Sequence, residues 1–99
     1  MRKIFAAIII TVVLCGVAYA ERFSKFPDYG ICMGDSVRCR EKPGKKSEVI
    51  KHINKGDEVQ VVGQHKAGGE LWYEVYTEPD SEYEEGPFWV SARYIEPEH

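Results

Sequence analysis

The stretch "VRCREKPGKKSEVIKHINKGDEVQVVG", residues 37–63, decides the fold. It contains three short segments of alternating character, separated by Pro-Gly and Lys-Gly pairs that are typical of turns. Val37 and Cys39 alternate with arginines in the first segment, and Val59 and Val61 stand on either side of Gln60 in the last. Period-two alternation indicates a half-buried strand, because successive side chains point to opposite faces. The stretch therefore predicts three consecutive short strands.

The same pattern extends to both sides of this stretch. Residues 30–33, 70–77 and 87–91 are further short apolar segments, and no window has a helical period. Five or six strands of this length would leave long unpaired edges in a flat sheet, which closure into a barrel removes. We therefore predict an all-β fold, a small β-barrel of five to six short antiparallel strands. The expected inward-facing residues are Val37, Cys39, Val49, Ile53, Val59, Val61, Tyr73 and Val75.

The first twenty residues have the composition of a secretory signal peptide. Two cations precede an apolar run from Ile4 to Val17, and Ala18-Tyr19-Ala20 fits a small-residue cleavage site. This predicts a secreted or periplasmic protein, with residues 1–20 removed, 21–29 as a linker and 30–96 as the domain. Contact with a membrane is expected only if the segment stays uncleaved as an anchor.

The charge balance argues against nucleic acid as a partner. Removal of Arg2 and Lys3 leaves 11 basic and 16 acidic side chains, a net charge of −5. Nucleic-acid binders usually carry a net basic domain or stripe. The cations are nonetheless segregated, because residues 38–66 hold eight of them against four acids and residues 67–92 hold none. We expect one end of the barrel to be positive and another negative.

Cys32 and Cys39 are the two cysteines that would remain after export, where disulfides are permitted. A hairpin with a two-residue loop at Asp35-Ser36 would place them opposite each other, so we predict a disulfide between them. Two buried free thiols are the alternative interpretation. A zinc site is disfavoured, because His52 and His65 lack a ligand spacing that matches the cysteines.

Catalytic chemistry is weakly represented in the chain. A Cys-His pair could act as a thiol hydrolase, but the predicted disulfide would use both cysteines. The acidic residues 78–85 offer oxygen ligands without the alternating spacing and central glycine of a calcium loop. We therefore predict that the protein is not an enzyme and has neither a metal nor another cofactor.

Aromatic residues are concentrated in the last third of the chain, more than a small barrel can bury. We expect Tyr73 and Trp89 to lie in the core. Rings on the outward parity or in the long loop, with nearby carboxylates, suit stacking on a glycan or capture of a cationic peptide. The predicted ligand-binding residues are Tyr76, Tyr83, Phe88, Glu74 and Glu85.

Residues 37–63, together with "LWYEV" at 71–75 and "WVSARYI" at 89–95, resemble the bacterial SH3 domain family. The resemblance covers residues 30–95 and implies an SH3-like barrel that acts as a binding module of the cell envelope. Its implied ligand is peptidoglycan or the peptides of peptidoglycan. An adaptor or inhibitor that binds another envelope protein through the loop "EPDSEYEEGPF", residues 78–88, is the alternative function.

Overall fold

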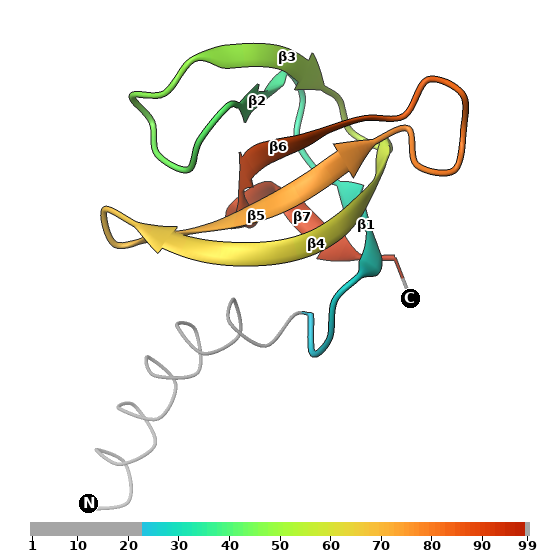
Figure 1. The fold of residues 1–99 in the computed structure, drawn as a ribbon, viewed down its shortest axis with the longest axis horizontal. Helices are drawn as coiled ribbons and strands as arrows, with labels where there is room; N and C mark the ends of the chain where they lie inside the picture. The colour runs from blue at the N-terminus through green and yellow to red at the C-terminus, as the bar shows by residue number, and fades with distance from the viewer. Residues whose placement is uncertain (1–22, 99) are drawn as a thin grey trace, which may run out of the picture.

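The computed structural model describes residues 23–98, so the predicted signal peptide lies outside the described residues. Within them no helix is long and apolar enough to span a membrane. The described chain consists of strands and one short 3-10 turn, η1 (Ala92–Tyr94) (Figure 1). The strands are β1 (Asp28–Cys32), β2 (Val37–Arg40), β3 (Val49–Ile53), β4 (Glu58–Ala67), β5 (Glu70–Thr77), β6 (Glu85–Ser91) and β7 (Ile95–Pro97).

All seven strands pair antiparallel in one sheet with the order β3-β2-β6-β5-β4-β1-β7, and Figure 1 shows the sheet curling around an interior. β4 is the longest strand and pairs with β5 along its length and with β1 over its first half. Its register shifts between Val61 and Gly63, and such a bulge bends a strand and increases its twist. The predicted all-β barrel fold is confirmed, with seven strands where five or six were expected.

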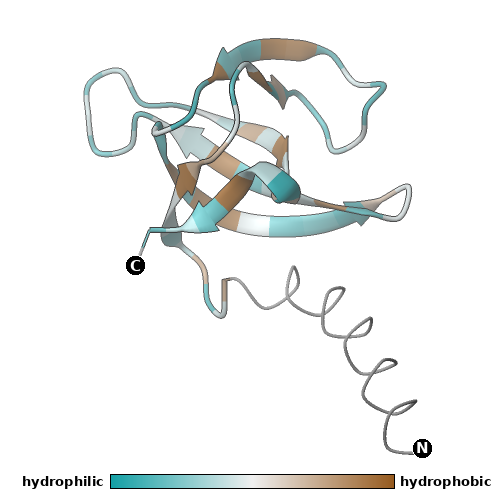
Figure 2. Cartoon of the chain, turned by 180° about the vertical axis from the view of Figure 1, so that it is seen from behind, coloured by the Kyte–Doolittle hydropathy of each residue, from teal (hydrophilic) through white to brown (hydrophobic). Residues whose placement is uncertain are grey.

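The core lies inside the curled sheet, where apolar residues of the strands gather (Figure 2). Tyr73, Val75, Val59 and Val61 are fully buried there, because β4 and β5 pair in a register that turns all four inward. Of the eight residues predicted to face inward, only Val49 is no more than half-buried.

The packed structure begins earlier than the predicted linker allows. Phe23 is buried, and its ring meets that of Tyr73 edge-on with 5.1 Å between centroids. β1 begins at Asp28, and Gly30 lies so close to the Ile95 side chain that a Cβ there would approach it to 2.9 Å. Residues 23–29 are therefore part of the domain.

The predicted hairpin between Cys32 and Cys39 is not formed. Both edges of β1 are occupied, one by β4 and the other by β7, so β2 pairs instead with β3 and β6. Cys32 consequently lies opposite Ile95, and Cys39 lies opposite Lys51. Both cysteines are buried in the core as free thiols. The disulfide prediction is wrong because it assumed that neighbours in sequence would be neighbours in the sheet.

Reductant should therefore leave the stability of the domain unchanged. No covalent bridge joins the two cysteines of residues 23–98, so the unfolded domain has no loop-closure term to lose. We expect the same melting temperature for residues 21–99 with and without excess reductant. Thiol titration should find both cysteines protected in the native protein and reactive after denaturation. A lower melting temperature in reductant would contradict the free-thiol state.

Candidate functional site

The five residues predicted to bind a ligand do not come together. Phe88 is buried in the core opposite Val75, so its assignment to the surface is wrong. Tyr83 is 65% exposed in the loop before β6, and Glu85 forms an ion pair with Lys51 at 3.0 Å. Glu74 and Tyr76 are half-buried on the outward face of β5. Tyr83 and Glu85 line one shallow pocket at the start of β6, but Glu74 and Tyr76 do not line it with them.

Parity along β6 explains the error at Phe88. Val90 and Phe88 share the inward face, and the residue between them, Trp89, therefore points outward beside Glu74 of β5. Trp89 is only half-buried, and its ring meets that of His65 edge-on with 6.3 Å between the ring centroids. The core assignment is correct for Tyr73 and wrong for Trp89.

A cleft of about 290 Å³ opens elsewhere, between β2, the 41–48 loop that follows it, β5, the end of β6, and η1. We call it the Trp72 cleft. Aromatic, hydroxyl and charged side chains line it together, and four of them are cationic. These four are Arg38, Arg40, Lys45 and Arg93.

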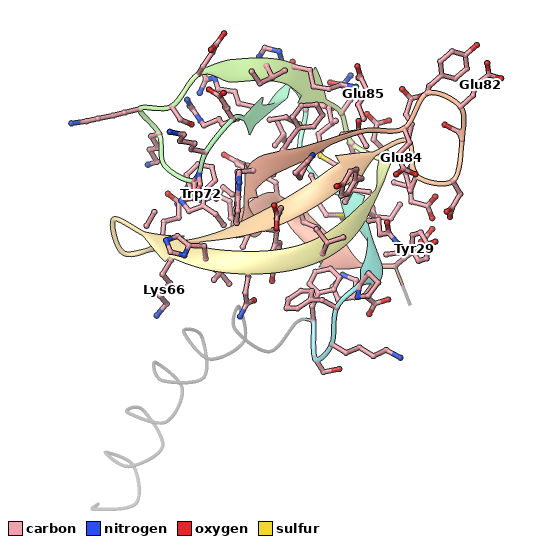
Figure 3. All side chains as sticks on the ribbon, viewed as in Figure 1. Tyr29, Lys66, Trp72, Glu82, Glu84 and Glu85 are labelled. Carbon is pink, nitrogen blue, oxygen red and sulfur yellow. The ribbon has the colours of Figure 1, made fainter. Side chains whose placement is uncertain are left out.

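Trp72 is the central apolar residue of this cleft. In the register of the sheet it lies between His65 of β4 and Ser91 of β6, on the outward face. It is nevertheless only 3% exposed. It also lines an adjoining pocket of about 340 Å³ with Lys45 and Lys46 of the 41–48 loop and with the β4–β5 turn (Figure 3).

The indole nitrogen of Trp72 is buried and has no hydrogen-bond partner among the described residues. It is the only buried side-chain nitrogen or oxygen in residues 23–98 without one. Buried polar groups are nearly always paired, since an unpaired one forfeits its hydration. An N–H in this state lining a cleft is a donor that an acceptor on a ligand would satisfy.

The 41–48 loop is held over the cleft by specific hydrogen bonds. The Arg40 guanidinium, on a residue that is 9% exposed, donates to the backbone oxygen of Ser47 at 2.8 Å. The Ser47 hydroxyl donates in turn to the backbone oxygen of Lys42 at 2.6 Å. Arg40 therefore acts mainly in positioning the loop, while Arg38 on the same strand is exposed.

Glu70 already places one carboxylate at the edge of the cleft. It accepts a hydrogen bond from the Ser91 hydroxyl and forms ion pairs with Arg93 at 3.5 Å and Lys45 at 3.9 Å. Asp35 is the other acidic residue of the lining. With four cations against two carboxylates, the Trp72 cleft keeps an excess of positive charge.

The opposite end of the barrel is acidic. Figure 3 shows Glu82, Glu84 and Glu85 at one end and Trp72 and Lys66 at the other. Four cations line the cleft around Trp72 and four glutamates line the pocket around Tyr83, as the charge pattern along the chain predicted. The Tyr29 hydroxyl donates to Asp80 at 2.6 Å, and this hydrogen bond raises the pKa of Tyr29. Among the described residues no group of His, Cys, Asp and Glu side chains is arranged to hold a metal ion.

These observations define a small all-β domain with one cleft whose lining carries an excess of positive charge. The model of the family described as Bacterial SH3 domain matches residues 35–96, well over half of the chain. The protein belongs to the bacterial SH3 domain family. Searches of curated proteins and of solved structures find no match to this chain.

The sequence patterns missed the residues that make up the Trp72 cleft. One signal was present, because Trp72 and Tyr73 are adjacent large residues and a strand can turn only one of them inward. No local pattern indicated that Arg38 and Arg93, far apart in the chain, line the same cleft.

Proposed function

We propose that this protein is a non-catalytic, exported binding module of the cell envelope that recognises peptidoglycan or its peptides through the Trp72 cleft. Membership of the bacterial SH3 domain family supports a binding module, often one associated with the cell wall. The observation that carries the choice of site is the buried, unpaired Trp72 N–H in a cleft lined by four cations. A peptide offers the carbonyl acceptors that such a donor requires.

The state of the two thiols supports a role without catalysis. A cysteine nucleophile acts as the thiolate, in an accessible and electropositive environment. Cys32 and Cys39 are both inaccessible, and burial raises the pKa of Cys39 to about 12. Their thiols stay protonated at neutral pH, so neither has the character of a nucleophile.

Sedimentation with insoluble peptidoglycan tests this proposal. We expect residues 21–99 to pellet with the wall, and Trp72→Phe to bind about tenfold more weakly, because phenylalanine keeps an aromatic ring at this position but lacks the N–H donor. Lys55→Gln, in the exposed β3–β4 turn, is the matched surface control and should bind like wild type. Equal retention of Trp72→Phe and wild type would refute the assignment of the cleft.

The alternative function is an adaptor or inhibitor that binds another envelope protein through residues 78–88. Its supporting observation is Tyr83, which is 65% exposed among acidic side chains that line a shallow pocket with it. Two results together would replace the proposed function by the adaptor function. Wild type would fail to pellet with insoluble peptidoglycan, and crosslinking to wild type would capture one protein that a Tyr83→Ala variant fails to capture.

A further inference from the structure

The cationic side chains of the Trp72 cleft differ in how far their charge is already neutralised. Arg40 donates its hydrogen bond to the 41–48 loop, and Lys45 and Arg93 both form ion pairs with the carboxylate of Glu70. Arg38 is exposed and forms no ion pair with any described residue. Arg38 lines the cleft together with Arg93, whose side chain is 52% exposed, so two guanidinium groups remain accessible.

Glu70 shows which kind of group this surface holds. A carboxylate is bound there by a hydroxyl donor and two cations from two separate parts of the chain, the 41–48 loop and the end of β6 with η1. Guanidinium groups bind carboxylates well, because their planar fork of N–H donors matches the two carboxylate oxygens. A second carboxylate entering the cleft would meet Arg38, Arg93 and Trp72 in its lining, and the indole N–H of Trp72 is still unpaired.

We propose that the recognised group of the ligand is a free carboxylate on a peptide. Arg38 and Arg93 bind the carboxylate, and the Trp72 N–H donates to a neighbouring carbonyl oxygen of the same peptide. This inference rests on the proposed function and specifies its ligand chemistry. The negative charge of the peptide then determines which ligand is bound, and the hydrogen bond from Trp72 fixes the position of the peptide backbone.

Amidation of the wall provides the direct test. Insoluble peptidoglycan is prepared in two forms, untreated and with its free carboxyl groups converted to amides. We expect the wild-type domain to bind the amidated wall about tenfold more weakly, since the amide has lost the charge that the guanidinium groups require. The double variant Arg38→Gln, Arg93→Gln should bind both forms equally weakly, and Lys55→Gln should behave as wild type.

The outcomes separate this inference from the proposed function. If wild type binds both forms equally well, the carboxylate inference fails and the proposed function stands. If it binds neither form, both fail. If amidation weakens binding while the double arginine variant binds like wild type, another part of the protein surface binds the carboxylate and the assignment to the cleft fails.

A third wall sample tests phosphate as the recognised group. The sample is freed of phosphate-containing polymers while its carboxylates stay intact, and the wild-type domain should bind it normally. A loss of binding to this sample would mean that phosphate is the group recognised.

The Trp72 N–H gives an independent readout in solution. The chain has two tryptophans, so its nitrogen-proton spectrum should contain two indole signals, which Trp89→Phe would assign. Soluble wall peptides released by digestion should shift the Trp72 signal downfield as the hydrogen bond forms. The same peptides after amidation should leave it in place at equal concentration. An unshifted Trp72 signal at saturating peptide would overturn the role given to its N–H.

Discussion

Replacing Tyr73 by alanine should destabilise the domain more than any surface substitution. Tyr73 is fully buried and contacts the ring of Phe23 in the centre of the core. Removing a buried aromatic side chain costs about 3–5 kcal/mol, because burial is lost and a cavity remains. In a domain of this size that is a large part of the total stability, and it corresponds to a melting temperature lower by roughly 15 °C or more.

Tyr83→Ala is the matched control for this experiment. The same side chain is removed from a position that is 65% exposed, so the free energy of unfolding should change by less than about 0.5 kcal/mol. Thermal and urea denaturation followed by circular dichroism measure both variants. Similar losses for the two variants would contradict the position of Tyr73 at the centre of the core.

Alkaline conditions should destabilise the domain through Cys39. Burial is the main cause that raises the pKa of this thiol to about 12, well above its value in an unfolded chain. Below the unfolded pKa both states hold the proton, and the full stability is present. Above it the unfolded chain releases its proton while the folded chain keeps it, so the free energy of unfolding falls with rising pH.

The expected size follows from the difference between the two pKa values. Between pH 8 and pH 10.5 the thiol should account for a loss of about 2 kcal/mol. Urea denaturation at the two pH values measures the loss for wild type and for Cys39→Ala. The alanine variant starts from a lower stability, but its decline over this interval should be smaller by about the same 2 kcal/mol. Equal declines in both proteins would show that Cys39 does not titrate as a buried thiol.

The Tyr73→Ala variant also tests whether the core supports the proposed binding site. Tyr73 faces the core from the same strand whose opposite face carries Trp72 and Glu70. A loss of core packing should therefore loosen the cleft, whereas Trp72→Phe changes the cleft alone. Wall binding by Tyr73→Ala and by Trp72→Phe is compared at a temperature where both variants are folded. This comparison separates a structural effect on the cleft from the loss of the N–H donor.

The sequence by itself determined most of the strands and the inward parity of most core residues. Alternation at Val37 and Cys39, or at Val59 and Val61, is a local property of the chain, and burial of one face follows from it. The segregation of cations from the acidic residues 78–85 was likewise readable, because it depends on composition along the chain.

Only the tertiary structure decided which strands pair and what they bring together. β1 takes β4 and β7 as neighbours, so Cys32 and Cys39 are close in sequence without being partners in a hairpin. Arg38 and Arg93 line one cleft because β2 pairs with β6, and η1 directly follows β6. Strand pairing depends on which edges remain free after the whole chain has packed, and a local pattern carries no information about those edges.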